Sequence, residues 1–145
     1  VLLLAHWDHL GECGAPEASD RICNGAVDNA SGLAVMLELA RRLKAGPPME
    51  RDVYVLATTA EEAGLLGARA FVKAPPVPLS GIVAAFNFDM LALAPAGSPV
   101  GFIGREQGAL DDAILAEFAR ADRREGDRAL ADGFVRRQDG WVLQQ

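Results

Sequence analysis

The sequence lacks both a surplus of positive charge and a long apolar run. Its 145 residues include 14 basic and 20 acidic ones, and this formal net charge of -6 argues against nucleic acid or an anionic membrane as a partner. No apolar run approaches the roughly 20 residues that a membrane-spanning helix needs. Internal repeats and low-complexity tracts are also absent, and half of the residues are hydrophobic. The composition is therefore typical of one globular domain with a sizeable core.

The chain also lacks an initiator methionine and a recognisable signal peptide. It opens at Val1 inside an apolar run, and it ends in "GWVLQQ" without a turn or a capping signal. We therefore expect residues 1–145 to be part of a single catalytic domain, truncated at both ends.

Cysteine is scarce, and the two cysteines flank one loop rich in glycine, proline and aspartate. Cys13 and Cys23 are ten positions apart, and a disulfide between them would indicate an exported protein. The alternative is a pair of free thiols, one of them packed as a small hydrophobic group. A zinc cluster with the nearby histidines is a third interpretation, but the paired C-x-x-C spacing typical of such clusters is absent. The sequence leaves the first two alternatives open.

Short apolar runs alternate with longer stretches of helical periodicity. The apolar runs predict buried strands at Val1–Ala5, Val53–Thr58, Ile82–Phe88 and Val100–Ile103. The periodic stretches predict helices at Leu33–Lys44, Ala63–Val72 and Ala109–Arg120. This alternation is typical of an α/β fold, with a largely parallel sheet flanked by helices on both faces. Ligands of such sheets bind beyond the carboxyl ends of the strands.

Residues suited to metal or proton chemistry follow the first three apolar runs and also precede the first helix. They are His6, Asp8, His9, Asp28, Glu61, Glu62 and Asp89. Each has a plain structural alternative: a surface histidine beside an aspartate, an N-cap in "DNAS", or acidic side chains that complement a helix dipole.

The combination is harder to explain by structure alone. Carboxylates gathered on one edge of a sheet repel each other, by about 4 kcal/mol per pair at about 4 Å and an effective dielectric near 20. Divalent cations relieve this repulsion, and an aspartate between two ions is a natural bridge. A donor set that mixes imidazole with carboxylate favours zinc over magnesium or calcium.

Four ordered motifs, "AHWDHLG", "NGAVDNASG", "TAEEAGLLGA" and "NFDM", closely resemble those of the di-zinc aminopeptidase family. That family also includes enzymes like glutamate carboxypeptidase, and its relatives include glutaminyl cyclases and receptor ectodomains. The resemblance is strong over about residues 1–91 and looser beyond them. It implies a zinc-exopeptidase fold of the α/β/α type, two Zn²⁺ ions per complete domain, and peptide or protein N-termini as substrates.

The resemblance also implies a role for each residue at the site. His6 resembles a ligand of one zinc, and Asp8 resembles the carboxylate that orients this imidazole. Asp28 resembles the aspartate that bridges the two ions, ahead of a cis peptide bond to Asn29. Glu61 resembles the general base that takes a proton from the metal-bound water. Glu62 resembles a ligand of the second zinc, and Asp89 a ligand of the first.

The resemblance further implies a second-zinc histidine late in the domain, and this chain has no histidine after His9. His9 has no ligand role in the resemblance and is expected only to line the site. Residues 92–99 are expected to contribute to a side-chain pocket. Exported relatives and the cysteine pair favour a periplasmic or extracellular location. Two other functions stay open, a glutaminyl-cyclase-like acyltransferase and a non-catalytic receptor-like module.

Overall fold

The computed structural model describes residues 1–91, 94–95 and 97–145. The chain forms two compact units. The first contains Val1–Ala92 and Gln138–Gln145, and the second contains Leu93–Arg137. Every residue proposed above as a metal ligand or proton carrier belongs to the first unit.

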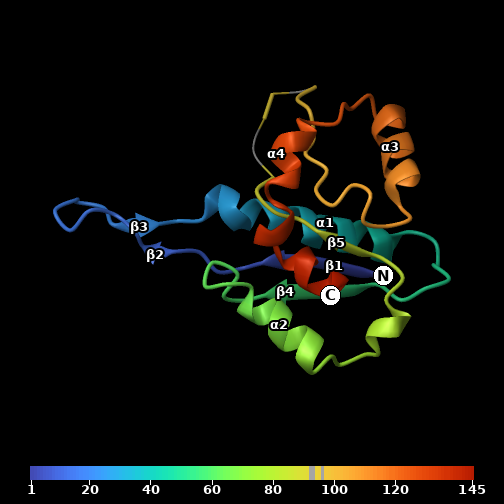
Figure 1. Cartoon of the computed structure of the whole chain (residues 1–145), viewed down its shortest axis with the longest axis horizontal. Coiled ribbons are helices and arrows are strands. Elements are labelled where there is room, and N and C mark those ends of the chain that lie inside the picture. The colour runs from blue at the N-terminus through green and yellow to red at the C-terminus, as the bar shows by residue number, and fades with distance from the viewer. Residues whose placement is uncertain (92–93, 96) are drawn as a thin grey trace. The chain divides into compact units, whose positions relative to one another are not determined.

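A three-stranded parallel sheet with the strand order β4-β1-β5 organises the first unit (Figure 1). It consists of β1 (Leu2–His6), β4 (Tyr54–Thr58) and β5 (Ala85–Asn87). All five residues of β1 are buried, as expected for a central strand covered on both faces. The predicted α/β class is thus confirmed, and the first three apolar runs form the strands, the third over fewer residues than predicted.

Helices cover both faces of this sheet. The helix α1 (Gly32–Ala45) packs its buried Met36 against Leu3 and Ala5 of β1. The short helix η4 (Asp139–Gln144) contacts β1, β5 and α2 (Leu66–Lys73), and Val142 packs with Leu65 and Ala68 there. The η2 turn (Leu79–Gly81) leads into β5.

The start of α2 differs from the prediction of a helix from residue 63. Gly64 and Leu65 have φ angles of 105° and 61°, a left-handed backbone that cannot continue an α-helix. The amides of both residues instead donate to the carbonyl of Glu61 at 2.9 Å. The segment after β4 is therefore a tight turn, and it leaves the Glu61–Glu62 pair outside the helix.

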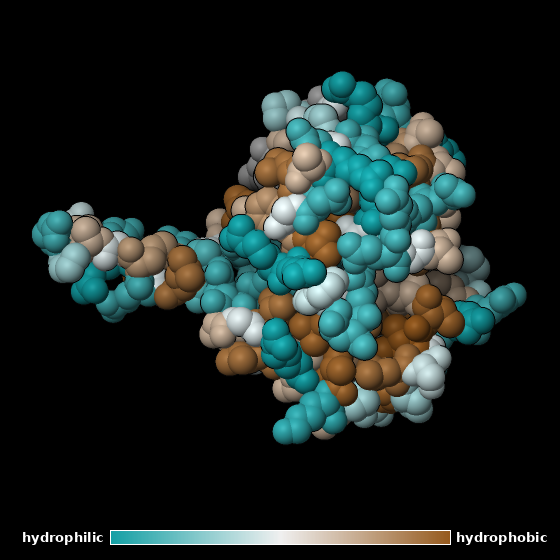
Figure 2. Space-filling model, viewed as in Figure 1, coloured by the Kyte–Doolittle hydropathy of each residue, from teal (hydrophilic) through white to brown (hydrophobic). Residues whose placement is uncertain are grey.

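A small antiparallel hairpin of β2 (Gly11–Glu12) and β3 (Ile22–Cys23) projects away from the sheet of its unit (Figure 1). A disulfide joins Cys13 to Cys23, whose Cα atoms are 5.8 Å apart, a usual separation for this bond. The free-thiol alternative is therefore not the arrangement in this structure. Both hydrophilic and apolar residues appear along the hairpin surface (Figure 2), and the disulfide favours an oxidising compartment.

The second unit contains α3 (Asp111–Arg120), α4 (Arg128–Asp132) and η3 (Val135–Arg137). Phe102 packs edge-on against Phe118, and Arg105 binds Glu125 at 2.6 Å. The strand predicted at Val100–Ile103 is wrong, because Val100 forms an isolated bridge with Glu125 rather than part of a ladder. Pro99 before it and Gly101 after it are poor strand formers, and they leave too short a run to pair further.

No helix among the residues that the structure describes is long and apolar enough to cross a membrane.

Candidate metal centre

The imidazole of His6 stands at the carboxyl end of β1 and faces two carboxylates. The residue is 1% exposed. Its Nδ1 lies 3.1 Å from the main-chain oxygen of Asp8, and its Nε2 lies 3.0 Å from Asp28 Oδ1 and 3.4 Å from Asp89 Oδ1. With a proton on Nδ1, the Nε2 lone pair points at negative oxygens. Such a group needs a second proton or a metal ion.

Without a metal ion, the His6 imidazole binds a second proton at neutral pH. Burial alone would lower the pKa of His6, but the hydrogen bond to Asp89 and the charges of Asp89, Glu61 and Asp28 outweigh it and raise the pKa to about 9.

Asp28 lies in η1 (Ala26–Ser31), and its peptide bond to Asn29 is cis, as the resemblance implies. The alternative of a helix cap within "DNAS" is met by the next residue, because Asn29 Oδ1 accepts a hydrogen bond from Gly32 N at the start of α1. Burial and the nearby charges of Glu62 and Asp89 raise the pKa of the Asp28 carboxyl. Its environment therefore favours either a proton or a cation.

Asn29 holds the Asp28 loop against the segment that carries Asp89. The side chain is 2% exposed; its Nδ2 donates to Phe88 O at 2.9 Å, and its Oδ1 accepts from Gly32 N at 3.0 Å and from Met90 N at 3.3 Å. A Cβ atom at residue 32 would lie 2.2 Å from both Asn29 Oδ1 and Phe88 O. Glycine at this position therefore permits the close approach of the two segments.

Asp8 fixes the Glu61–Glu62 turn as well as lying near His6. Its two carboxylate oxygens accept hydrogen bonds from Glu61 N at 3.1 Å and Glu62 N at 3.3 Å. The carboxylate oxygen Oδ1 is 3.7 Å from His6 Nδ1, farther than the main-chain oxygen of the same residue. Asp8 thus links the end of β1 to the turn after β4.

Glu61 has the protonation behaviour of a group that can exchange protons near neutral pH. Burial, together with the negative charges of Asp89, Asp139 and Glu62, outweighs the opposing charge of His6 and raises the pKa of Glu61 to about 7. A general base works best with a pKa close to the operating pH.

Two groups of potential metal ligands result, and Asp28 belongs to both. The first contains His6, Asp28 and Asp89, and the second contains His9, Asp28 and Glu62. Within each group the ligand atoms all lie within 4.8 Å of one another. The structure therefore brings together all four predicted ligands, and it adds His9, which the sequence analysis placed only at the edge of the site.

Sequence reasoning missed one buried carboxylate near this centre. Asp139 is fully buried at the start of η4 and accepts a hydrogen bond from the Thr58 hydroxyl at the end of β4. Its other oxygen, Oδ1, has no hydrogen-bond partner among the described residues, and burial raises the pKa of this carboxyl. The preceding Gln138 accepts from Asn87 of β5 at 2.9 Å. Nothing in the local pattern around Asp139 indicates these contacts.

Three residues of the loop predicted to contribute to a side-chain pocket, 92, 93 and 96, lie outside the described residues.

The metal-free chain is expected to lose stability as the pH rises from about 6.5 to about 9. Folding raises the pKa of His6 from 6.5 to about 9, so its stabilising effect is complete below the first value and is lost as the pH rises through the second. Glu61 acts in the same direction at lower pH, because folding raises its pKa from 4.5 to about 7, so its stabilising effect is lost between those two values. Thermal unfolding in a chelator across this range measures the effect. The slope should flatten in His6→Gln, and a wild-type stability that rises with pH would contradict the assignment.

Comparisons with known proteins match the chain to one peptidase family and to several curated relatives. The sequence pattern of Peptidase family M28 matches residues 1–140. The chain is 39% identical over 77 residues to the alkaline phosphatase isozyme conversion protein of Escherichia coli (strain K12), covering 50% of this chain and 22% of that protein. It is 42% identical over 69 residues to the probable lipoprotein aminopeptidase LpqL of Mycobacterium tuberculosis (strain ATCC 25618 / H37Rv). This match covers 47% of this chain and 14% of that protein.

A third relative is the aminopeptidase YwaD of Bacillus subtilis (strain 168), which is 43% identical over 68 residues, covering 46% of this chain and 15% of that protein. The chain thus spans less than a quarter of the length of the curated relatives that it matches. No solved structure matches it significantly.

Proposed function

Since this chain belongs to peptidase family M28, we propose that it carries the catalytic centre of a zinc-dependent aminopeptidase. Residues 1–145 would be part of a single peptidase domain that hydrolyses N-terminal peptide bonds. The observation that carries the proposal is the pair of histidine–carboxylate groups that share Asp28 at the carboxyl ends of the parallel strands. Two relatives named as aminopeptidases support the same reaction class.

Zinc is the metal proposed for both groups. Each offers one imidazole and two carboxylates, a donor set that suits zinc better than the all-oxygen sets preferred by magnesium and calcium. His6, Asp28 and Asp89 would hold one ion, and Glu62 and Asp28 would bind the other. When bound, zinc supplies a hydroxide nucleophile at neutral pH and polarises the scissile carbonyl.

The protein's own groups would handle the proton and position the site. Glu61, with its pKa near 7, takes a proton from the attacking water and delivers it to the leaving amine. Asp8 keeps Glu61 in place by accepting a hydrogen bond from its amide at 3.1 Å. Asn29 fixes the Asp28 and Asp89 segments relative to each other. Peptide or protein N-termini are the proposed substrates, and the disulfide supports export to an oxidising compartment.

A paired assay tests the proposed function. The chain is expected to release the first residue of a peptide with a free amino terminus and to leave the N-acetylated peptide intact. Dialysis against a chelator should abolish this release, and added zinc should restore it. Cyclisation of an N-terminal glutamine peptide without hydrolysis would favour the acyltransferase alternative. Zinc binding with neither reaction would contradict the proposal.

A further inference from the structure

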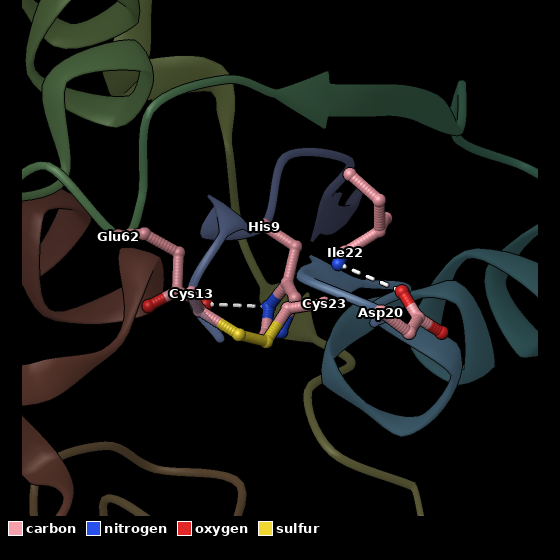
Figure 3. Close-up of a disulfide and its surroundings, with 6 residues drawn as sticks. All are labelled: His9, Cys13, Asp20, Ile22, Cys23 and Glu62. Atoms are coloured by element: carbon pink, nitrogen blue, oxygen red, sulfur yellow. Dashed lines mark hydrogen bonds and ion pairs between the residues drawn. A yellow bond between two sulfur atoms is a disulfide. The ribbon is translucent and has the colours of Figure 1, made fainter. Parts of the chain in front are cut away.

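The second histidine of the chain lies within the site rather than at its edge. His9 Nδ1 is 2.8 Å from Glu62 Oε1 (Figure 3), and the ligand atoms of His9, Glu62 and Asp28 converge within 4.8 Å. This group shares only Asp28 with the group around His6. Each histidine therefore faces two carboxylates, and one of them, Asp28, is common to both.

The backbone makes room for the His9 ring at this place. A Cβ atom at residue 25 would lie 2.9 Å from His9 Cβ, 3.0 Å from His9 Cγ and 2.8 Å from Asp28 O. Gly25 also has a φ of 63°, in the left-handed region that favours glycine. The His9 side chain thus packs against the backbone of Gly25, beside the carbonyl of Asp28. Any side chain at residue 25 would displace His9, Asp28 or both.

A hydrogen bond to Glu62 alone does not account for this arrangement. One His–Glu pair at 2.8 Å satisfies both partners, and the Asp28 carboxylate, which faces His6 at 3.0 Å, brings a second negative charge to the same pair. In a tetrahedral zinc site with bonds of about 2.1 Å, the ligand atoms are about 3.4 Å apart. To share one ion, the His9 and Glu62 ligand atoms, which are 2.8 Å apart, would separate by about 0.6 Å, and any pair at the 4.8 Å limit would approach by about 1.4 Å.

We propose that His9 is a direct ligand of the second zinc, together with Glu62 and the shared Asp28. The inference rests on the proposed function and adds a residue to it. Both histidines of the chain are then metal ligands, one for each ion. His9 supplies the imidazole of this three-residue set from the segment that follows β1.

Zinc stoichiometry after dialysis, measured by elemental analysis, tests the proposal without reference to activity. The wild-type chain is expected to hold about two zinc ions and His9→Gln about one. Glutamine keeps a hydrogen-bond donor for Glu62 but is a poor zinc ligand, so this variant separates ligation from positioning. His9→Asp supplies a carboxylate ligand and should recover part of the second ion.

A His9→Gln chain that retains as much zinc as the wild type, at the same affinity, would overturn the assignment. His6→Gln serves as the comparison, because it should lose the ion that His9→Gln retains. Circular dichroism of each variant controls for folding. A wild-type chain that binds no zinc would overturn the proposed function itself, whereas the loss of one ion only in His9→Gln would support both.

Discussion

The Glu61→Gln variant is expected to retain its bound zinc and to hydrolyse peptides about 10²- to 10⁴-fold more slowly than the wild type, the usual contribution of a general base. Glutamine has nearly the same shape as glutamate but cannot accept the proton from the attacking water. The amide of residue 61 still donates to Asp8, so the turn is preserved. Metal content by elemental analysis and kcat on a free N-terminal peptide measure the two effects separately.

Glu50→Gln provides the matched control, because Glu50 lies on an exposed segment between α1 and β4 and its substitution makes the same change in charge. This variant should leave both zinc content and kcat unchanged. If Glu61→Gln kept a rate within a few-fold of the wild type, Glu61 would not be the base. If the variant lost zinc as well, the residue would be acting through the metal site rather than through the proton.

The Asp28→Asn variant is expected to weaken the binding of both zinc ions. Its carboxylate belongs to both ligand groups, whereas every other ligand belongs to one. The loss should exceed the 10- to 100-fold typical of a residue that only supports a metal ligand. The same substitution removes one of the two carboxylates that face His6 Nε2. Competition with a chromogenic chelator gives both affinities in one titration.

Asp52→Asn is the control for this experiment, since Asp52 is exposed and lies just before β4, at the opposite end of that strand from the site. It should bind zinc as the wild type does. Selective loss of one ion in Asp28→Asn, with the other at full affinity, would contradict the shared position of Asp28.

The sequence predicts where the candidate site lies in the fold better than it predicts the hydrogen bonds within that site. Buried parallel strands have a plain signal in continuous apolar runs, and the residues after three of them, including His6, Glu61 and Asp89, do lie near one another. The strand predicted at Val100–Ile103 fails because an apolar run without an adjacent partner strand forms no ladder. Element boundaries also depend on single backbone conformations, such as the left-handed residues before α2.

The supporting contacts depend on tertiary packing that no local pattern encodes. Asn29 has the sequence context of a capping residue, and it does accept a bond from the first turn of α1, yet its other bonds reach the segment after β5. Asp139 is one acidic residue in a polar stretch, and only the packing of η4 against the sheet brings it to Thr58. The bond of His9 to Glu62 likewise joins positions 53 apart in sequence.

These long separations also determine when the site comes into being. His6 and Asp89 are 83 positions apart, and Thr58 and Asp139 are 81 apart. Contacts of this kind require the long intervening loops to close, at an entropic cost that local contacts do not carry. Chains in which these loops have not closed therefore lack the assembled ligand groups. We expect tight zinc retention only in molecules in which β4 and β5 have both paired with β1.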